Sequence, residues 1–261
     1  MQRAHGRADV VFGATGLRHL HQSGCAKALL PRNFQPTPEA AFLNTSGGVT
    51  GGDQLEYSAK VEANTALCVT TQAAERIYKS CSGAAKITNM LTLEANSRLE
   101  WLPQETILFE GSVLKRQLNV EMADTAHLLA VETLVLGRRA MGETLREASI
   151  SDQWRVRRGG RLVFADALRF GSPTTKTLST TATLNGNRAL STILYIAPDA
   201  EARIDHARSL LKFEGVEAGA SAWNGMLSVR FLAPDAQPLR AALVAFLTQF
   251  RGCELPRIWH M

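Results

Sequence analysis

Short segments in which apolar and polar residues alternate recur along most of the chain. In residues 54–61, Leu55 and Tyr57 would face one side of a strand while Glu56 and Ser58 face the other. This two-residue period is that of a β-strand with one buried face. Because turn residues separate many such segments, the sequence predicts a mainly β fold.

Two turn signals support this interpretation. Asn224-Gly225 and Gly159-Gly160 each lie between two strand-like segments, and both pairs favour tight hairpins. Residues 127–136 are nearly all apolar and could also form a helix, but their β-branched residues and the following Gly137 favour a strand. The predicted strands cover residues 54–61, 67–71, 87–93, 99–102, 118–122, 127–136, 154–156, 162–164, 188–197, 218–223 and 226–232.

Two late segments have helical periodicity instead. Apolar residues recur at helical spacing in Asp199–Phe213, behind a candidate cap at Asp199. Asp235–Arg251 carries a full apolar stripe, and Gly252 ends it. We find no low-complexity linker and no repeat with a fixed period, so we expect a single domain over residues 1–261.

Composition narrows the class of protein. Hydrophobic residues make up 45% of the chain and charged residues 20%, which is typical of a soluble globular protein. No apolar run approaches the roughly 18 residues of a membrane span, and no secretory segment begins the chain. The four cysteines are scattered, so we expect reduced thiols and a cytoplasmic protein.

The segment Asn44–Asp53 contains two glycine pairs, Gly47-Gly48 and Gly51-Gly52. A phosphate-binding loop of the Walker type needs Lys followed by Ser or Thr after its last glycine, whereas Asp53 follows here. A dinucleotide-binding fingerprint needs a helix after the glycines, whereas a predicted strand follows. The segment is therefore expected to be a turn or a docking loop.

Other side chains suggest further classes of chemistry. Paired carboxylates such as Glu105 and Asp166 could serve a hydrolase built on a β scaffold, which is the alternative to a non-enzymatic protein. His19 and His21 would share one face of a strand, but two imidazoles make a weak metal site. Carboxylates lining a polar passage for a cation are an equally physical use of acidic residues.

Arginines gather in two places, and the net charge of +5 comes from 29 basic and 24 acidic residues. Such clusters can pair with carboxylates of an acidic protein partner. Nucleic acid is a less favoured partner because interleaved aromatic platforms are missing. The candidate docking residues are Arg138, Arg139, Arg157, Arg158 and Arg161.

Five motifs, taken in order, resemble the signature of the urease accessory protein family UreD, called UreH in some organisms. The match is densest from about Asn44 to Asp166 and does not rest on the glycine segment alone. The motifs occupy residues 44–53, 70–78, 102–109, 136–143 and 160–166.

The resemblance implies a maturation factor without catalysis of its own. Members of this family bind UreF, which recruits the GTPase UreG, and the assembly docks on apo-urease to deliver nickel. The implied fold is an irregular β-helical stack of many short strands with two amphipathic helices near the C-terminus. No tightly bound cofactor is expected, and nickel would bind transiently. Candidate residues of a nickel passage are the polar ones within the motifs: Asp53, Gln72, Glu75, Gln104, Glu105 and Asp166.

Overall fold

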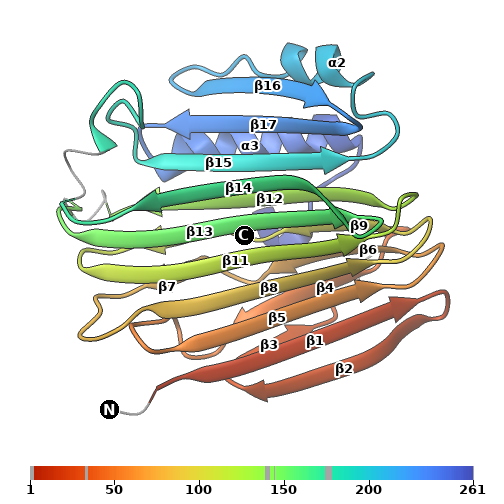
Figure 1. Cartoon of the computed structure of the whole chain (residues 1–261), viewed down its shortest axis with the longest axis horizontal. Helices are drawn as coiled ribbons and strands as arrows, with labels where there is room; N and C mark the ends of the chain where they lie inside the picture. Colours follow the sequence, from red (N-terminus) through yellow and green to blue (C-terminus); the bar gives the residue numbers. More distant parts are fainter. Residues whose placement is uncertain (1–2, 33–34, 139–141, 144, 174–177, 261) are drawn as a thin grey trace.

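Two β-sheets face each other and enclose most of the core (Figure 1). The computed structural model describes residues 3–32, 35–138, 142–143, 145–173 and 178–260. The front sheet has the strand order β14-β13-β11-β8-β5-β1-β2. Its strands are β1 (His5–Gly13), β2 (Gly16–Gly24), β5 (Gln54–Val61), β8 (Ala85–Leu93), β11 (Ser112–Met122), β13 (Ala148–Arg158) and β14 (Arg161–Phe170).

The back sheet has the order β16-β17-β15-β12-β9-β6-β4-β3, and two short strands, β7 (Glu75–Ile77) and β10 (Thr106–Leu108), extend it beside β12. It continues past the β14 edge of the front sheet (Figure 1). Its long path is formed by β3 (Ala26–Leu29), β4 (Glu39–Asn44), β6 (Ala66–Thr71), β9 (Arg98–Leu102), β12 (His127–Leu136), β15 (Ala189–Ile196), β16 (Glu217–Trp223) and β17 (Met226–Ala233).

The chain winds between the two sheets as a stack of coils. Strands β4, β6, β9 and β12 lie parallel in the back sheet, while β5, β8, β11 and β13 lie parallel in the front sheet. Successive coils lie directly over one another. In the back sheet, for example, Glu39 of β4 pairs with Cys68 of β6, and Cys68 pairs with Glu100 of β9. Antiparallel strands border the stack, with β2 on β1 and β14 on β13. This arrangement confirms the predicted irregular β-helical stack.

The main core lies between the sheets, where inward residues of both sheets meet. In β5 every second residue is buried, as the alternating sequence predicts. The ring of Phe42 stacks on Tyr57 of the facing sheet with 4.8 Å between centroids, and Trp101 packs against Phe42 at 6.3 Å in a tilted arrangement. Burial of each large apolar side chain contributes about 1.5–3 kcal/mol, so this layer holds the sheets together.

A second core lies between the outer face of the back sheet and the helix α3 (Ala236–Arg251). Phe246 of α3 is fully buried, and its ring packs edge-on to Phe231 of β17 at 5.5 Å. Asp235 caps the start of α3, and Gly252 ends it with a left-handed φ of 69°. The predicted helix and its glycine stop are confirmed, and the structure adds the cap at Asp235.

The other predicted helix is shorter than expected. Helix α2 covers Ile204–Ser209, whereas the apolar spacing predicted Asp199–Phe213. The side chain of Asp199 accepts a hydrogen bond from the Tyr195 hydroxyl at 2.7 Å, and the cap position falls on Arg203. Asp199 therefore does not cap α2, which begins without a side-chain cap. A short 3-10 helix, η2 (Arg257–His260), follows α3.

The first four strands were not predicted from the sequence. Strand β2 has no buried residue, so it lacks the alternation that marks a half-buried strand. His19 and His21 lie on this strand, both exposed, as the strand hypothesis for them requires. Among the described residues, no helix combines the length and the apolar character needed to cross a membrane.

Candidate functional site

Four of the sequence motifs stack on one another where β7 and β10 extend the back sheet beside the end of β12. Val49 of the glycine segment bridges to Ile77, which lies opposite Leu108 of β10. Leu108 in turn lies opposite Leu136 at the end of β12. The motifs lie far apart in the chain but form successive rungs there, and this explains why they occur in a fixed order.

The glycine segment makes the turn of the first rung. Gly48 has a φ of 141°, and a side chain there would meet the Arg76 carbonyl oxygen at 2.7 Å and the Tyr78 ring at 2.4 Å. Asp53 is buried, and its two carboxylate oxygens accept hydrogen bonds from the backbone amides of Ala4 and Thr50. The second glycine pair and Asp53 therefore close the turn and tie it to the N-terminal strand.

Substituting Gly48 with alanine is expected to destabilise the fold by about 2 kcal/mol, because a Cβ would clash with backbone at a strained φ. Gly47 is the matched control: its φ of 76° is also left-handed, but its Cβ would meet open space. Gly47→Ala should therefore cost about 1 kcal/mol. Urea unfolding of both variants measures the difference, and equal losses would contradict the close-packing role of Gly48.

Beside this turn, Glu75 of β7 lies in a small pocket. The pocket has a volume of about 120 Å³ and is lined by Asn44, Gly48 and Tyr57, among others. The Asn44 amide donates a hydrogen bond to Glu75 Oε1 at 3.0 Å. Burial raises the pKa of Glu75 from 4.5 to about 7, although this hydrogen bond opposes the shift. The carboxyl group is therefore poised to change charge near neutral pH.

A charged cluster lies deep between the sheets. Arg116 of β11 donates two hydrogen bonds to Asp152 of β13, at 3.0 and 2.6 Å. The same guanidinium lies 3.0 Å from Glu132 Oε2 and donates to the Thr106 hydroxyl at 3.0 Å. All four residues are buried. Burial raises the pKa of Glu132, and Arg116 offsets only part of that shift.

Two acceptor atoms in this cluster lack a hydrogen bond. Glu132 Oε1 accepts from the Asn89 amide at 3.2 Å and from the Trp101 indole at 3.3 Å. Neither Asn89 Oδ1 nor Glu132 Oε2 has a donor with hydrogen-bond geometry. Glu132 Oε2 is still compensated by its ion pair with Arg116, so Asn89 Oδ1 is the acceptor without a partner in this cluster. A buried acceptor without a donor is costly and rare, and it invites a functional explanation such as passage of a cation.

The cluster reaches the surface where the front sheet ends at β14. A pocket of about 70 Å³ lies there, lined by Arg116, Glu132 and Asp152 together with Asp166 and Arg230. Asp166 accepts a hydrogen bond from Arg230 of β17 at 2.6 Å, across the seam between the two sheets. Arg230 is largely exposed, so this ion pair lies at the outer end of the pocket.

Polar residues, here called the polar row, follow one another from the Glu75 pocket to the seam pocket, and strand pairing alone relates Glu75 to Thr106. Glu75 lies opposite Thr106 in the parallel pairing of β7 with β10. The Thr106 hydroxyl accepts from Arg116, which contacts Glu132 and Asp152 at the seam pocket. The carboxylates are thus spaced along the interior rather than gathered in one cage. Within the described ranges, no three His, Cys, Asp or Glu side chains are grouped to hold a metal ion.

The structure places the six predicted passage residues in different surroundings. Glu75 and Asp166 lie at the two ends of the polar row, while Asp53 closes its turn. Gln72 is exposed. Gln104 and Glu105 both accept from Arg240 of α3, at 2.6 and 3.2 Å. Glu105 and Asp166, the candidate hydrolase pair, are thus paired with different arginines.

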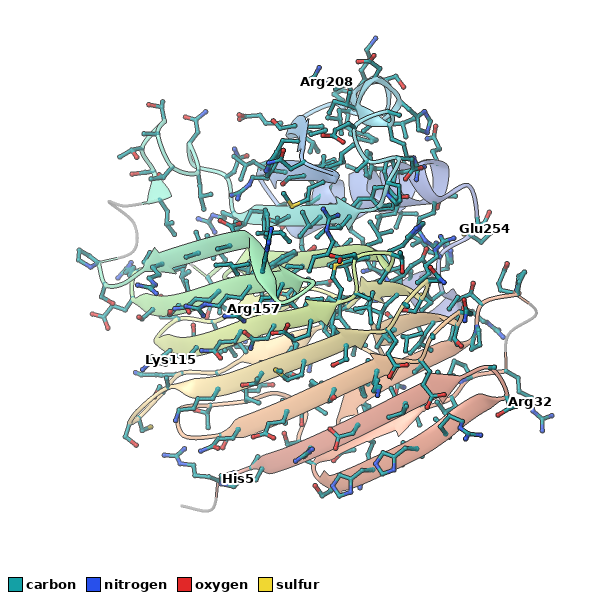
Figure 2. The ribbon with its side chains drawn as sticks, turned by 45° about the vertical axis from the view of Figure 1, so that its right-hand side comes forward. His5, Arg32, Lys115, Arg157, Arg208 and Glu254 are labelled. Atoms are coloured by element: carbon teal, nitrogen blue, oxygen red, sulfur yellow. The ribbon has the colours of Figure 1, made fainter. Side chains whose placement is uncertain are left out.

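The predicted docking arginines lie at opposite ends of β13. Arg138 is exposed, pairs with Glu143 at 3.0 Å and lies over the Phe109 ring at 4.2 Å. The hairpin arginines, by contrast, lie near the end of β13, where Arg158 is opposite Arg161. Arg157 projects from the outer face of the front sheet (Figure 2) and pairs with Glu121 at 3.4 Å. Arg139 lies outside the described residues.

Sequence reasoning missed Arg116, Glu132, Asp152 and Asn89. Each occupies an inward position in a strand whose neighbouring inward residues are apolar, as in β13 between Ile150 and Trp154. Glu132 is the carboxylate within the nearly apolar segment 127–136. The signal that could have identified them is a charged or polar residue at a position where the alternation of a strand predicts a buried apolar one.

Comparison with known proteins agrees with the motifs. The family model described as UreD urease accessory protein matches residues 4–260. A urease accessory protein UreD from Xanthobacter autotrophicus is 47% identical over 99% of this chain and 90% of its own length. Those from Dinoroseobacter shibae and Rhizobium etli are 48% and 44% identical over 100% of this chain, covering 94% and 96% of their own lengths. The chain belongs to the UreD family of urease accessory proteins.

Proposed function

We propose that this chain serves urease maturation as a non-catalytic accessory protein that passes nickel to apo-urease in the cytoplasm. It would act together with UreF and, through UreF, with UreG. Family membership supports the role in maturation. The observation that carries the nickel proposal is the polar row from Glu75 to Asp166, in which the buried Asn89 Oδ1 has no donor and Glu132 Oε2 is held by its ion pair with Arg116.

The chemistry of the row suits a cation in transit. Ni²⁺ accepts carboxylate and amide oxygens, and a few such ligands at each step would hold it weakly enough to release it. Arg116 opposes a resident cation because its charge already pairs with Asp152 and Glu132. An arriving ion would therefore compete with the guanidinium for these carboxylates. This competition would keep binding of the ion weak and reversible.

The experiment is urease activation with Glu132→Gln and Asp166→Asn variants. Both changes keep the shape of the side chain but remove the negative charge, so nickel content of urease should fall at least fivefold. Glu56→Gln is the matched control, because Glu56 is exposed on the outer face of the front sheet. Nickel per active site is measured by atomic absorption, with urease activity beside it.

Pull-down of UreF and apo-urease shows whether each variant still assembles. We expect assembly to be unchanged, because the altered residues lie inside the fold or in its seam. Full nickel content with both variants would refute the passage. Asp53, Gln72, Gln104 and Glu105 stay predictions for that passage, as do the hairpin arginines Arg157, Arg158 and Arg161 for partner docking.

A further inference from the structure

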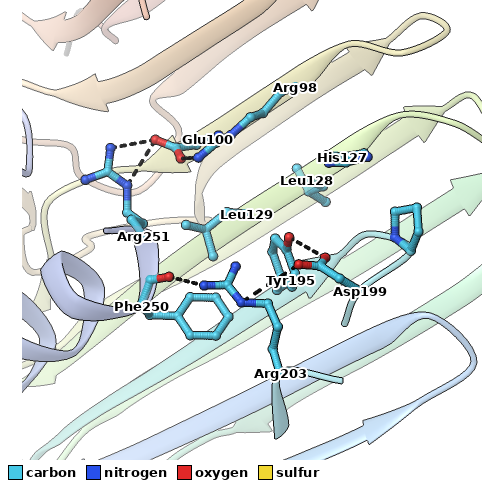
Figure 3. Close-up of a pocket in the computed structure, with 11 residues that line it drawn as sticks. Arg98, Glu100, His127, Leu128, Leu129, Tyr195, Asp199, Arg203, Phe250 and Arg251 are labelled. Atoms are coloured by element: carbon cyan, nitrogen blue, oxygen red, sulfur yellow. Dashed lines mark hydrogen bonds and ion pairs between the residues drawn. The ribbon is translucent and has the colours of Figure 1, made fainter. Parts of the chain in front are cut away.

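A larger cavity lies away from the polar row, on the outer face of the back sheet. It has a volume of about 340 Å³ and lies between the C-terminal end of α3 and the turn that precedes α2 (Figure 3). That volume lies within the range of pockets that hold small organic ligands. Neither the nickel proposal nor the stacked motifs use this cavity.

Charged residues line the cavity on two sides, with apolar groups between them. On one side are Arg98 and Glu100 of β9 with Arg251 of α3; on the other are Asp199 and Arg203 (Figure 3). Tyr195 and Pro198 supply the accessible apolar surface, and the buried Leu129 and Phe250 lie behind it. The cavity therefore offers an apolar surface for the body of a ligand and charged groups for its polar end.

The charges leave one cation in excess. Arg251 and Glu100 form a buried pair, with two hydrogen bonds at 3.1 and 2.7 Å. Two arginines therefore share the single negative charge of Glu100. Arg251 neutralises that charge, and Arg98, whose guanidinium also donates to Glu100 at 2.6 Å, supplies the positive charge in excess. Its side chain is 52% exposed. His127 lies opposite Arg98 in the pairing of β12 with β9 and adds a polar imidazole beside it.

The facing side of the cavity is already ordered. The guanidinium of Arg203 lies 3.9 Å from the Phe250 ring centroid and 5.1 Å from that of Tyr195. It also donates a hydrogen bond to the Phe250 carbonyl oxygen. Asp199 lies 4.0 Å from Arg203 and accepts from the Tyr195 hydroxyl, so its charge is balanced. An ordered wall lowers the entropy that a ligand must lose on binding.

We propose that this cavity binds a ligand with a single carboxylate on a compact apolar body. The carboxylate would lie against Arg98 and His127, and the apolar body would cover Tyr195 and Pro198. One net positive charge matches one carboxylate, whereas a doubly charged phosphate would exceed it. The carboxylate belongs either to a free small acid or to the C-terminal residue of a peptide.

Calorimetric titration of the full chain with hexanoate and with hexanamide tests the proposal. The two probes have the same apolar body and differ in charge, so hexanoate should bind at least tenfold more tightly. N-acetylglycyl-leucine and its C-terminal amide test the peptide source in the same way. A preference for the free acid in either pair supports the site, and the tighter pair identifies the source; no preference in both pairs overturns it.

Arg98→Gln locates the binding in the cavity. The substitution should weaken the preferred acid at least tenfold and leave thermal unfolding near that of the wild type, because Arg98 is half-exposed and Glu100 keeps its pair with Arg251. Arg155→Gln is the matched control: Arg155 is an exposed arginine on the front sheet that contacts Gln153. Unchanged affinity in Arg98→Gln would refute the cavity as the site, whatever the outcome for nickel delivery.

Discussion

Replacing Arg116 with methionine is expected to lower the free energy of unfolding by about 3 to 5 kcal/mol. The guanidinium is buried between the sheets and pairs with Asp152 at 2.6 Å and Glu132 at 3.0 Å. Methionine fills similar space but leaves two buried carboxyl groups without a counter-charge. Urea unfolding near pH 7.5 measures the loss, which should shrink under mildly acidic conditions because Glu132 can then bind a proton.

Two further variants separate the loss of charge from the loss of packing. Arg155→Met removes an exposed arginine from the neighbouring strand and should change stability by less than about 0.5 kcal/mol. The triple variant Arg116→Met, Asp152→Asn and Glu132→Gln removes all three charges and should recover much of the loss. An Arg116→Met protein as stable as the wild type would show that the cluster does not depend on this guanidinium.

Substituting Glu75 with glutamine is expected to change how stability depends on pH. Burial raises the pKa of Glu75 from 4.5 to about 7, so the folded protein holds this proton more tightly than the unfolded chain. The contribution of Glu75 to the free energy of unfolding therefore falls as the pH rises from 4.5 to about 7. Glutamine removes the effect, and the gain of the variant over the wild type should grow by about 2 to 3 kcal/mol from pH 5 to pH 8.

Glu132 also carries a raised pKa, so the wild-type pH profile alone does not isolate Glu75. The difference between wild type and Glu75→Gln at each pH cancels the contribution of Glu132. Glu56→Gln provides the control, because Glu56 is exposed on the front sheet and should give a difference that is nearly independent of pH. A flat difference for Glu75→Gln would contradict the burial of its carboxyl group.

Much of the secondary structure could be predicted because its signals are local. Residues 54–61 and 127–136 form β5 and β12 with the predicted bounds. The Asn224-Gly225 pair has positive φ at both residues and joins β16 to β17 as its type predicts. Helix α3 could be predicted from its apolar stripe and its glycine stop.

The repeating coils could not be recognised from the sequence because successive coils contain different numbers of residues. The step from Glu39 to Cys68 is shorter than the step from Cys68 to Glu100, although both pairs stack directly. Extra residues enter the turns rather than the strands, so the register persists while the period varies. For the same reason, no search for a fixed spacing would align the glycine segment with the rungs of Glu75 and Thr106.

The sequence by itself determined the β-rich class, the hairpins, the helix α3 and the family, since each rests on neighbouring residues or ordered motifs. Only the tertiary structure decided which polar residues meet. Arg116, Glu132 and Asp152 come from three strands, and pairing between and within sheets brings them together. Charges are stabilised inside a protein by partners close in space, and local sequence does not encode that closeness. The same reason separates Asp53, which closes a turn, from Asp166, which lies in the seam.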